Sequence, residues 1–101
     1  MMKNWQYLLL KLSEECNEVG QMASKNMHFG TEETQTGGCQ TNRQRLHGEI
    51  NDLLAIVELL NEEEGFDFTP DAVSIALKKD KVKFYREYSR SLGLVEDSNE
   101  S

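Results

Sequence analysis

The sequence predicts an all-α protein, a helical hairpin followed by a long third helix that together form a four-helix-bundle-type oligomer. Apolar residues recur every three or four positions in three long segments, and no segment alternates as a strand would. Because 101 residues bury little surface in a single copy, three amphipathic helices gain their missing burial against further copies. We therefore expect a homodimer or a homotetramer.

The first predicted helix covers about residues 4 to 28 and ends at Gly30, which suits a helix C-cap. The polar segment 31–42 follows, contains Gly37 and Gly38, and lacks any apolar rhythm, so we expect a mobile loop. The helical periodicity is carried by Trp5, Leu8, Leu9, Leu12, Cys16, Val19 and Ala23.

The second predicted helix begins near Thr41 and ends at Gly65. Thr41 and Gln44 have the spacing of a capping box, in which each side chain pairs with the other residue's backbone N–H. The apolar positions of this helix are Leu46, Ile50, Leu53, Val57 and Leu60.

The third helix has its predicted N-cap at Thr69, its first helical residue at Pro70 and its end at Leu92. Gly93 and Leu94 fit a Schellman motif after that end. We expect residues 1–94 to form one domain, and the acidic, nearly apolar-free tail 95–101 to be disordered.

The formal charge of -7 argues against a nucleic acid polymer as partner, because an acidic surface repels a phosphate backbone. Small phosphorylated ligands remain compatible, since carboxylates that bind divalent cations invert the local charge. No stretch approaches 18 apolar residues and no signal peptide is recognisable, so we expect neither membrane association nor export. Two cysteines without metal-type spacing agree with a cytoplasmic protein.

Two pairs of carboxylates stand where the predicted helices should face a partner. At about 100° per residue, Glu15 and Glu18 lie about 60° and 120° from Leu12, both on one side of it. In the second helix Glu49 and Asp52 lie about 40° and 100° from Leu53, again on one flank. An antiparallel hairpin brings the pairs together, so these carboxylates must either protonate or gather around a cation. An all-oxygen site suits Mg²⁺ or Mn²⁺.

The same residues carry a family resemblance. Glu14-Glu15-Cys16-Asn17-Glu18 followed by Glu49-Ile50-Asn51-Asp52 resembles the EExxE…ExxD signature of MazG-like proteins, the all-α NTP pyrophosphohydrolase superfamily. In looser form the resemblance extends over roughly residues 5 to 92. The 30 residues between Glu18 and Glu49 make a slightly longer gap than is usual in that family.

The resemblance implies that Glu15, Glu18, Glu49 and Asp52 bind Mg²⁺, for which Mn²⁺ can substitute, and that Glu14 is an accessory catalytic residue. The implied reaction is attack of water on the α-phosphorus of a nucleoside triphosphate, which releases the monophosphate and pyrophosphate. We also expect basic residues to bind the β- and γ-phosphates. The candidates are Lys25, Arg43, Lys78, Lys81 and Lys83, with Arg45 also beside the loop.

Several alternatives stay open at the level of sequence. The enzyme either acts on many normal and modified nucleotides or is specific for one of them. A different class of function is a non-catalytic helical module that keeps the fold and acts by binding a partner. Trp5 and Tyr88 are expected in the core, although both have rings that stack on a nucleobase.

Overall fold

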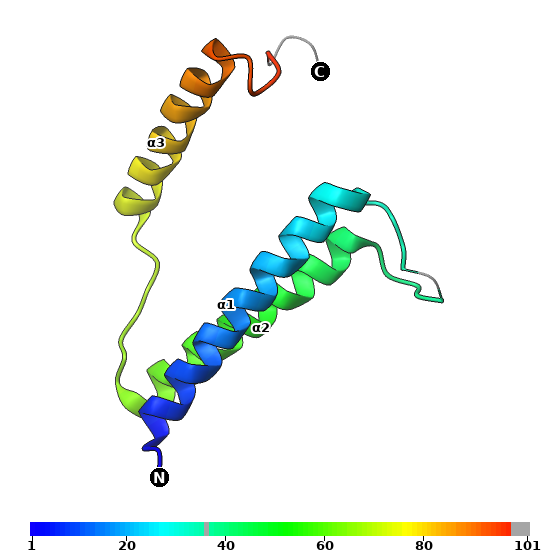
Figure 1. The fold of residues 1–101 in the computed structure, drawn as a ribbon. Helices are drawn as coiled ribbons and strands as arrows, with labels where there is room; N and C mark the ends of the chain where they lie inside the picture. The colour runs from blue at the N-terminus through cyan, green and yellow to red at the C-terminus, as the bar shows by residue number, and fades with distance from the viewer. Residues whose placement is uncertain (36, 98–101) are drawn as a thin grey trace. The chain divides into compact units, whose positions relative to one another are not determined.

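The computed structural model describes residues 1–35 and 37–97 of the chain. Its three helices are α1 (Asn4–Phe29), α2 (Asn42–Glu64) and α3 (Ala72–Ser91), and the described residues form no strand beyond one isolated bridge (Figure 1). The all-α prediction is confirmed. The chain divides into two compact units, Met1–Phe68 and Thr69–Ser101, which are described separately below. Among the described residues, no helix combines the length and the apolar character that a membrane span requires.

Helices α1 and α2 lie side by side and run in opposite directions (Figure 1). At one end, the Asn4 side-chain amide donates to the carboxylates of Glu63 (3.0 Å) and Glu64 (2.9 Å). At the other end, the Asn26 amide donates to the carbonyl of Asn42 at 3.0 Å. The predicted helical hairpin is therefore confirmed, and its two ends are held by side-chain amides.

The ends of α1 and α2 follow the sequence signals closely. Gly30 has a φ of 95° after α1, and Gly65 has a φ of 63° after α2, a region that favours glycine. The predicted capping box is present, since Gln44 N–H donates to Thr41 Oγ1 at 3.1 Å and Thr41 N–H donates to Gln44 Oε1 at 2.9 Å.

The segment between α1 and α2 has more structure than the sequence predicted. The N–H groups of Asn42 and Arg43, which open α2, donate to the carbonyls of Glu33 and Thr31, each at 2.9 Å. Thr34 and Thr41 form an isolated antiparallel bridge. These bonds hold part of the predicted loop against the start of α2, because the loop backbone supplies acceptors to N–H groups that have no partner within the helix.

Helix α3 begins later than predicted. Asp71, and not Thr69, is the N-cap: its Oδ1 accepts from Ser74 N–H at 2.7 Å, so Pro70 lies outside the helix. Hydrogen bonds from Ser74 lower the pKa of the Asp71 carboxyl group. Thr and Asp are both good N-caps, and in the structure it is Asp71 whose side chain accepts from the first turn of the helix.

The end of α3 agrees with the prediction, with Leu92 as C-cap immediately after Ser91. Gly93 N–H donates to the carbonyl of Arg90 at 3.0 Å, and Leu94 N–H donates to that of Ser89 at 2.9 Å, which is the Schellman pattern. The predicted tail 95–101 lies outside the described residues from 98 onward. Within its described part, the carbonyl of Glu96 accepts from Arg90 Nε at 2.9 Å.

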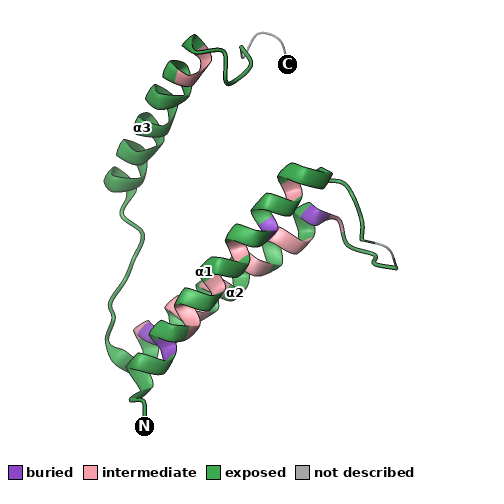
Figure 2. Cartoon of the chain, in the orientation of Figure 1, coloured by how far each residue is buried: buried purple, intermediate pink, exposed green. Residues whose placement is uncertain are grey.

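The interface between α1 and α2 is narrow, and its fully buried residues sit mainly toward the two ends of the hairpin (Figure 2). Leu8 and Leu60 are buried toward one end, and Met22 and Asn42 toward the other. Between them the interface consists of half-buried residues. On α1 these include Leu12, Glu15 and Val19, and on α2 they include Leu46, Glu49, Leu53, Ile56 and Val57.

The buried face of α1 is not its most apolar face. Cys16 and Ala23 are exposed although the periodicity placed them in the core, and Trp5 is 44% exposed. The predicted core positions of these residues are wrong for a single chain, because the hairpin contact is rotated by about 50° toward Glu15. In the second unit α3 contains no buried residue, so Tyr88 is exposed as well.

Asn42 is the buried polar residue of the hairpin, at 1% exposure. Its amide donates to the Gly30 carbonyl at 2.9 Å and to Glu33 Oε1 at 3.3 Å. We predict that Asn42→Ala lowers the free energy of unfolding by about 2 kcal/mol, because the Gly30 carbonyl loses its partner. Urea denaturation followed by circular dichroism measures the change. Asn51→Ala, at an exposed position of the same helix, is the matched control and should shift stability by less than about 0.5 kcal/mol.

Candidate metal centre

Three carboxylates converge where α1 and α2 face each other. Glu15 and Glu18 come from α1 and Glu49 from α2, and one oxygen of each lies within 4.8 Å of those of the other two. Glu15 and Glu49 are half-buried in the interface, whereas Glu18 is exposed at its edge, one helical turn along from Glu15. The hairpin therefore brings together three of the four predicted metal ligands.

The cluster changes the acidity of its members. The pKa of Glu15 is raised, first by partial burial, which disfavours the charged form, and then by the neighbouring Glu18. The pKa of Glu49 is raised by the same burial and then by Glu18 and Asp52, while the positive charge of Arg45 opposes the shift. Neither carboxylate therefore has enough positive charge beside it to offset the burial and the neighbouring negative charges.

The hydrogen bonding of the cluster is incomplete. Glu15 Oε2 and Glu49 Oε2 are both buried and have no hydrogen-bond partner. Buried carboxylate oxygens normally have a donor or a cation beside them, since an unpaired one is costly. Oxygen donors from three converging carboxylates are the ligand set that Mg²⁺ and Mn²⁺ prefer, so the residues present fit such an ion.

Asp52 and Glu14 take different positions from the three central acids. Asp52 is exposed on α2, and its charge is close enough to raise the pKa of both Glu15 and Glu49. Glu14 is exposed and forms an ion pair with Lys11 at 3.2 Å. Asp52 therefore borders the cluster, whereas Glu14 already has a cationic partner on its own helix.

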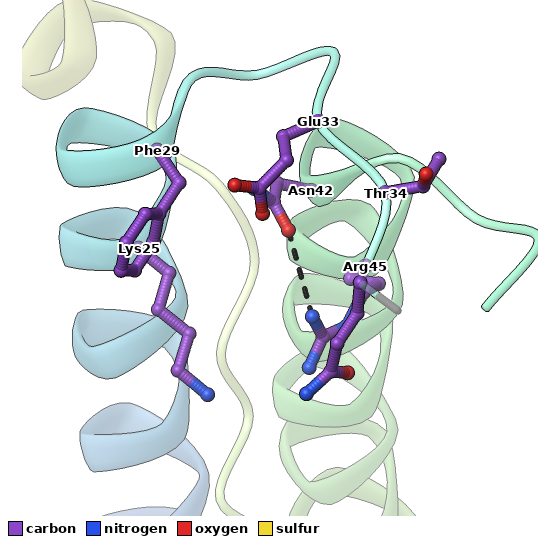
Figure 3. Close-up of a pocket in the computed structure, with 7 residues that line it drawn as sticks. Lys25, Phe29, Glu33, Thr34, Asn42 and Arg45 are labelled. Carbon is purple, nitrogen blue, oxygen red and sulfur yellow. Dashed lines mark hydrogen bonds between the residues drawn. The ribbon is translucent and has the colours of Figure 1, made fainter. Parts of the chain in front are cut away.

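A pocket of about 320 Å³ lies at the loop end of the hairpin (Figure 3). Lys25 from α1 and Arg45 from α2 both reach into the space between the helices, with the ring of Phe29 beside Lys25. Among the described residues neither cation forms an ion pair, whereas Arg43 pairs with Glu32 at 3.1 Å. The remaining lining residues are Glu33, Thr34, Gln35 and Asn42.

The three candidate lysines of α3 belong to the second unit and are exposed. Lys78 and Lys83 line one groove together with Ile75 and Val82, and Lys81 lines a second groove together with Tyr85. Their role in binding phosphate stays a prediction.

Phe29 and Glu33 had no assigned role in the sequence analysis, although both line the pocket. Their position near the turn could have indicated this, because a hairpin places the end of its first helix and the following loop close to the start of its second helix. Arg45 had been placed beside the loop but not in a site, and its charge acts on Glu49.

No known protein family matches the sequence, and neither a curated protein nor a solved structure is significantly similar to it.

The raised pKa values predict how metal-free stability depends on pH. A carboxyl group with a raised pKa binds its proton more tightly in the folded state, so stability falls as pH rises from the ordinary value of 4.5 through the raised value. In EDTA, the melting temperature of the wild type should therefore fall as the pH rises above about 4.5. Glu49→Gln should flatten this fall and melt higher at pH 7, because one of the crowded charges is gone.

Glu58→Gln is the matched control, since Glu58 is exposed on the same helix and lies outside the cluster. It should retain the pH dependence of the wild type. Mg²⁺ should raise the melting temperature of the wild type and of Glu58→Gln at pH 7, but that of Glu49→Gln much less. Identical pH profiles for all three proteins would contradict the crowding of these carboxylates.

Proposed function

We propose that the protein is a Mg²⁺-dependent nucleoside triphosphate pyrophosphohydrolase, with Glu15, Glu18, Glu49 and Asp52 as metal ligands and Mn²⁺ as a possible substitute. It cleaves the α–β phosphoanhydride of a nucleoside or deoxynucleoside triphosphate. The observation that carries the proposal is the convergence of Glu15, Glu18 and Glu49, with two buried oxygens that lack any partner. The EExxE…ExxD resemblance supplies the reaction.

In this reaction a water oxygen bonds to the α-phosphorus, and the bond from that phosphorus to the α–β bridging oxygen breaks. The bridging oxygen leaves with pyrophosphate, and the water proton passes to a carboxylate or to solvent. A bound divalent ion supplies charge neutralisation and lowers the pKa of water. The carboxylates of the cluster orient the attacking water and accept its proton, with Glu14 as an accessory residue.

Cationic side chains are needed because a triphosphate carries more negative charge than the divalent ions cancel. Lys25 is the best-supported candidate, since it reaches into the inter-helix space and has no anionic partner among the described residues. Arg43 would have to exchange its ion pair with Glu32 for a phosphate. Lys78, Lys81 and Lys83 are proposed to contribute from α3.

We further propose a homodimer or homotetramer built as a helical bundle. The support is the apolar surface that each unit by itself leaves uncovered: the exposed face of α1 includes Trp5 and Leu9, and the exposed residues of α3 include Val73, Leu77 and Phe84. Patches of this kind commonly mark protein interfaces. A cytoplasmic location completes the proposal, since Cys16 and Cys39 are both free thiols.

The enzymatic proposal predicts that the protein with Mg²⁺ converts at least one triphosphate in a panel of NTPs and dNTPs to its monophosphate and pyrophosphate. Glu18→Gln and Glu49→Gln should each lower kcat/KM by about 100-fold or more, because charge stabilisation of the transition state depends on the cluster. Glu58→Gln should retain activity. Products are separated by ion-exchange chromatography, and pyrophosphate is measured by a coupled assay.

Release of orthophosphate would refute the proposed bond cleavage. A protein that hydrolyses no triphosphate, and whose melting temperature does not respond to Mg²⁺, would be better described as a non-catalytic helical module.

The oligomer predicts a particle of two or four times the 11.6 kDa chain mass in size-exclusion chromatography with light scattering. Replacing exposed apolar residues by charged ones, as in Leu9→Glu, should shift that mass toward a single chain, because burying an unpaired charge is costly. Lys3→Glu, at an exposed residue just before α1, is the control. A monomeric wild type would contradict the bundle.

A further inference from the structure

The loop-end pocket has the chemistry of a site for a flat heterocycle. Phe29 contributes an aromatic ring on the α1 side, and polar groups from the loop and from α2 lie across the space between the helices (Figure 3). Its volume of about 320 Å³ is at the lower end of the range for small-molecule sites. The pocket is formed within the first unit, by α1, α2 and the loop that joins them.

The polar side of the pocket presents acceptors next to donors. Asn42 lies between Glu33 and Arg45: its amide nitrogen donates to Glu33 Oε1 at 3.3 Å, and its Oδ1 accepts from Arg45 at 3.5 Å. Because Asn42 is buried, it holds a carboxylate on one side and a guanidinium on the other. The second oxygen of Glu33 has no hydrogen-bond partner among the described residues, and Arg45 keeps unused N–H donors.

Among the nucleobases, this arrangement suits guanine. Its N1–H and N2 amino group are adjacent donors for a carboxylate, and the neighbouring O6 and N7 are adjacent acceptors for a guanidinium. Adenine and cytosine each place a ring-nitrogen acceptor beside their amino group, and uracil flanks its single N–H with two carbonyls. These acceptors would face the carboxylate and repel it.

We propose that this pocket binds the guanine base of the substrate, with Phe29 stacking on the ring, Glu33 accepting from N1–H and N2, and Arg45 donating to O6 and N7. The assignment rests on the proposed function, in which the phosphates of the nucleotide bind to the divalent ion held by the acidic cluster. Arg45 precedes Glu49 by four residues, a rise of about 6 Å along α2. A nucleotide therefore spans the two sites, with its phosphates toward the cluster and its base toward the loop.

The test measures binding of nucleoside monophosphates by calorimetry, which needs no hydrolysis. The full chain with Mg²⁺ should bind GMP at least about tenfold more tightly than AMP, CMP or UMP. IMP, which lacks the N2 amino group, should bind more weakly than GMP. Glu33→Gln should abolish the preference for GMP over IMP, since the amide keeps an acceptor for Asn42 and turns a donor toward the base.

Glu32→Gln is the matched control, because Glu32 is the adjacent loop carboxylate and pairs with Arg43 outside the pocket. It should keep the guanine preference. Equal affinity for the four nucleotides, no binding of any of them, or an unchanged GMP/IMP ratio in Glu33→Gln would overturn the assignment. Pyrophosphate binding as tight as that of GMP and equally sensitive to Arg45→Gln would do so too, because it would make the pocket a phosphate site.

The two proposals fail separately. Loss of the guanine preference with Mg²⁺-dependent pyrophosphate release intact would overturn the base assignment alone. A guanine preference that depends on Glu33, in a protein without hydrolytic activity, would support the base site and refute the reaction.

Discussion

Two carboxylates, Glu15 and Glu49, lie inside the helix–helix interface of the hairpin, and the candidate site depends on how their charge is compensated. An apolar pair at these positions would pack the hairpin better, since partial burial and repulsion from Glu18 make both carboxylates unfavourable when charged. A divalent cation between them would supply the missing positive charge, and the charged carboxylates would then stabilise the hairpin. Stability and the proposed activity are therefore linked through the same atoms.

The position of these acids explains why the apolar face of α1 is only partly covered. The hairpin contact is centred near Glu15, so Trp5, Leu9 and Cys16 on the adjacent flank remain exposed. Because α1 uses one flank for the acidic cluster, its other flank remains available for apolar packing. This division of surfaces suits an assembly in which further helices cover the apolar side, and α3 has unburied residues of the same character.

Asn42 connects the loop, the pocket and α2. Its backbone N–H begins α2 by bonding to Glu33, its carbonyl accepts from Asn26, and its side chain lies between Glu33 and Arg45. Asn42 thus positions Glu33 and Arg45, which are proposed to bind a base, and also connects the two helices. The acidic cluster and the proposed base site lie on the same hairpin, which favours a fixed distance between them.

The sequence alone determined the three helices, the capping box at Thr41 and the Schellman end of α3, because these features depend on neighbours within a few residues. It also predicted the acidic pairs, since an acid at a helical core position is visible in the periodicity. Only the tertiary structure decided that α1 turns Glu15 rather than Cys16 toward α2, and that Glu33, Asn42 and Arg45 share a pocket. Those outcomes depend on contacts between segments that are distant in sequence. No local sequence pattern shows which of the alternative contacts has the lower free energy.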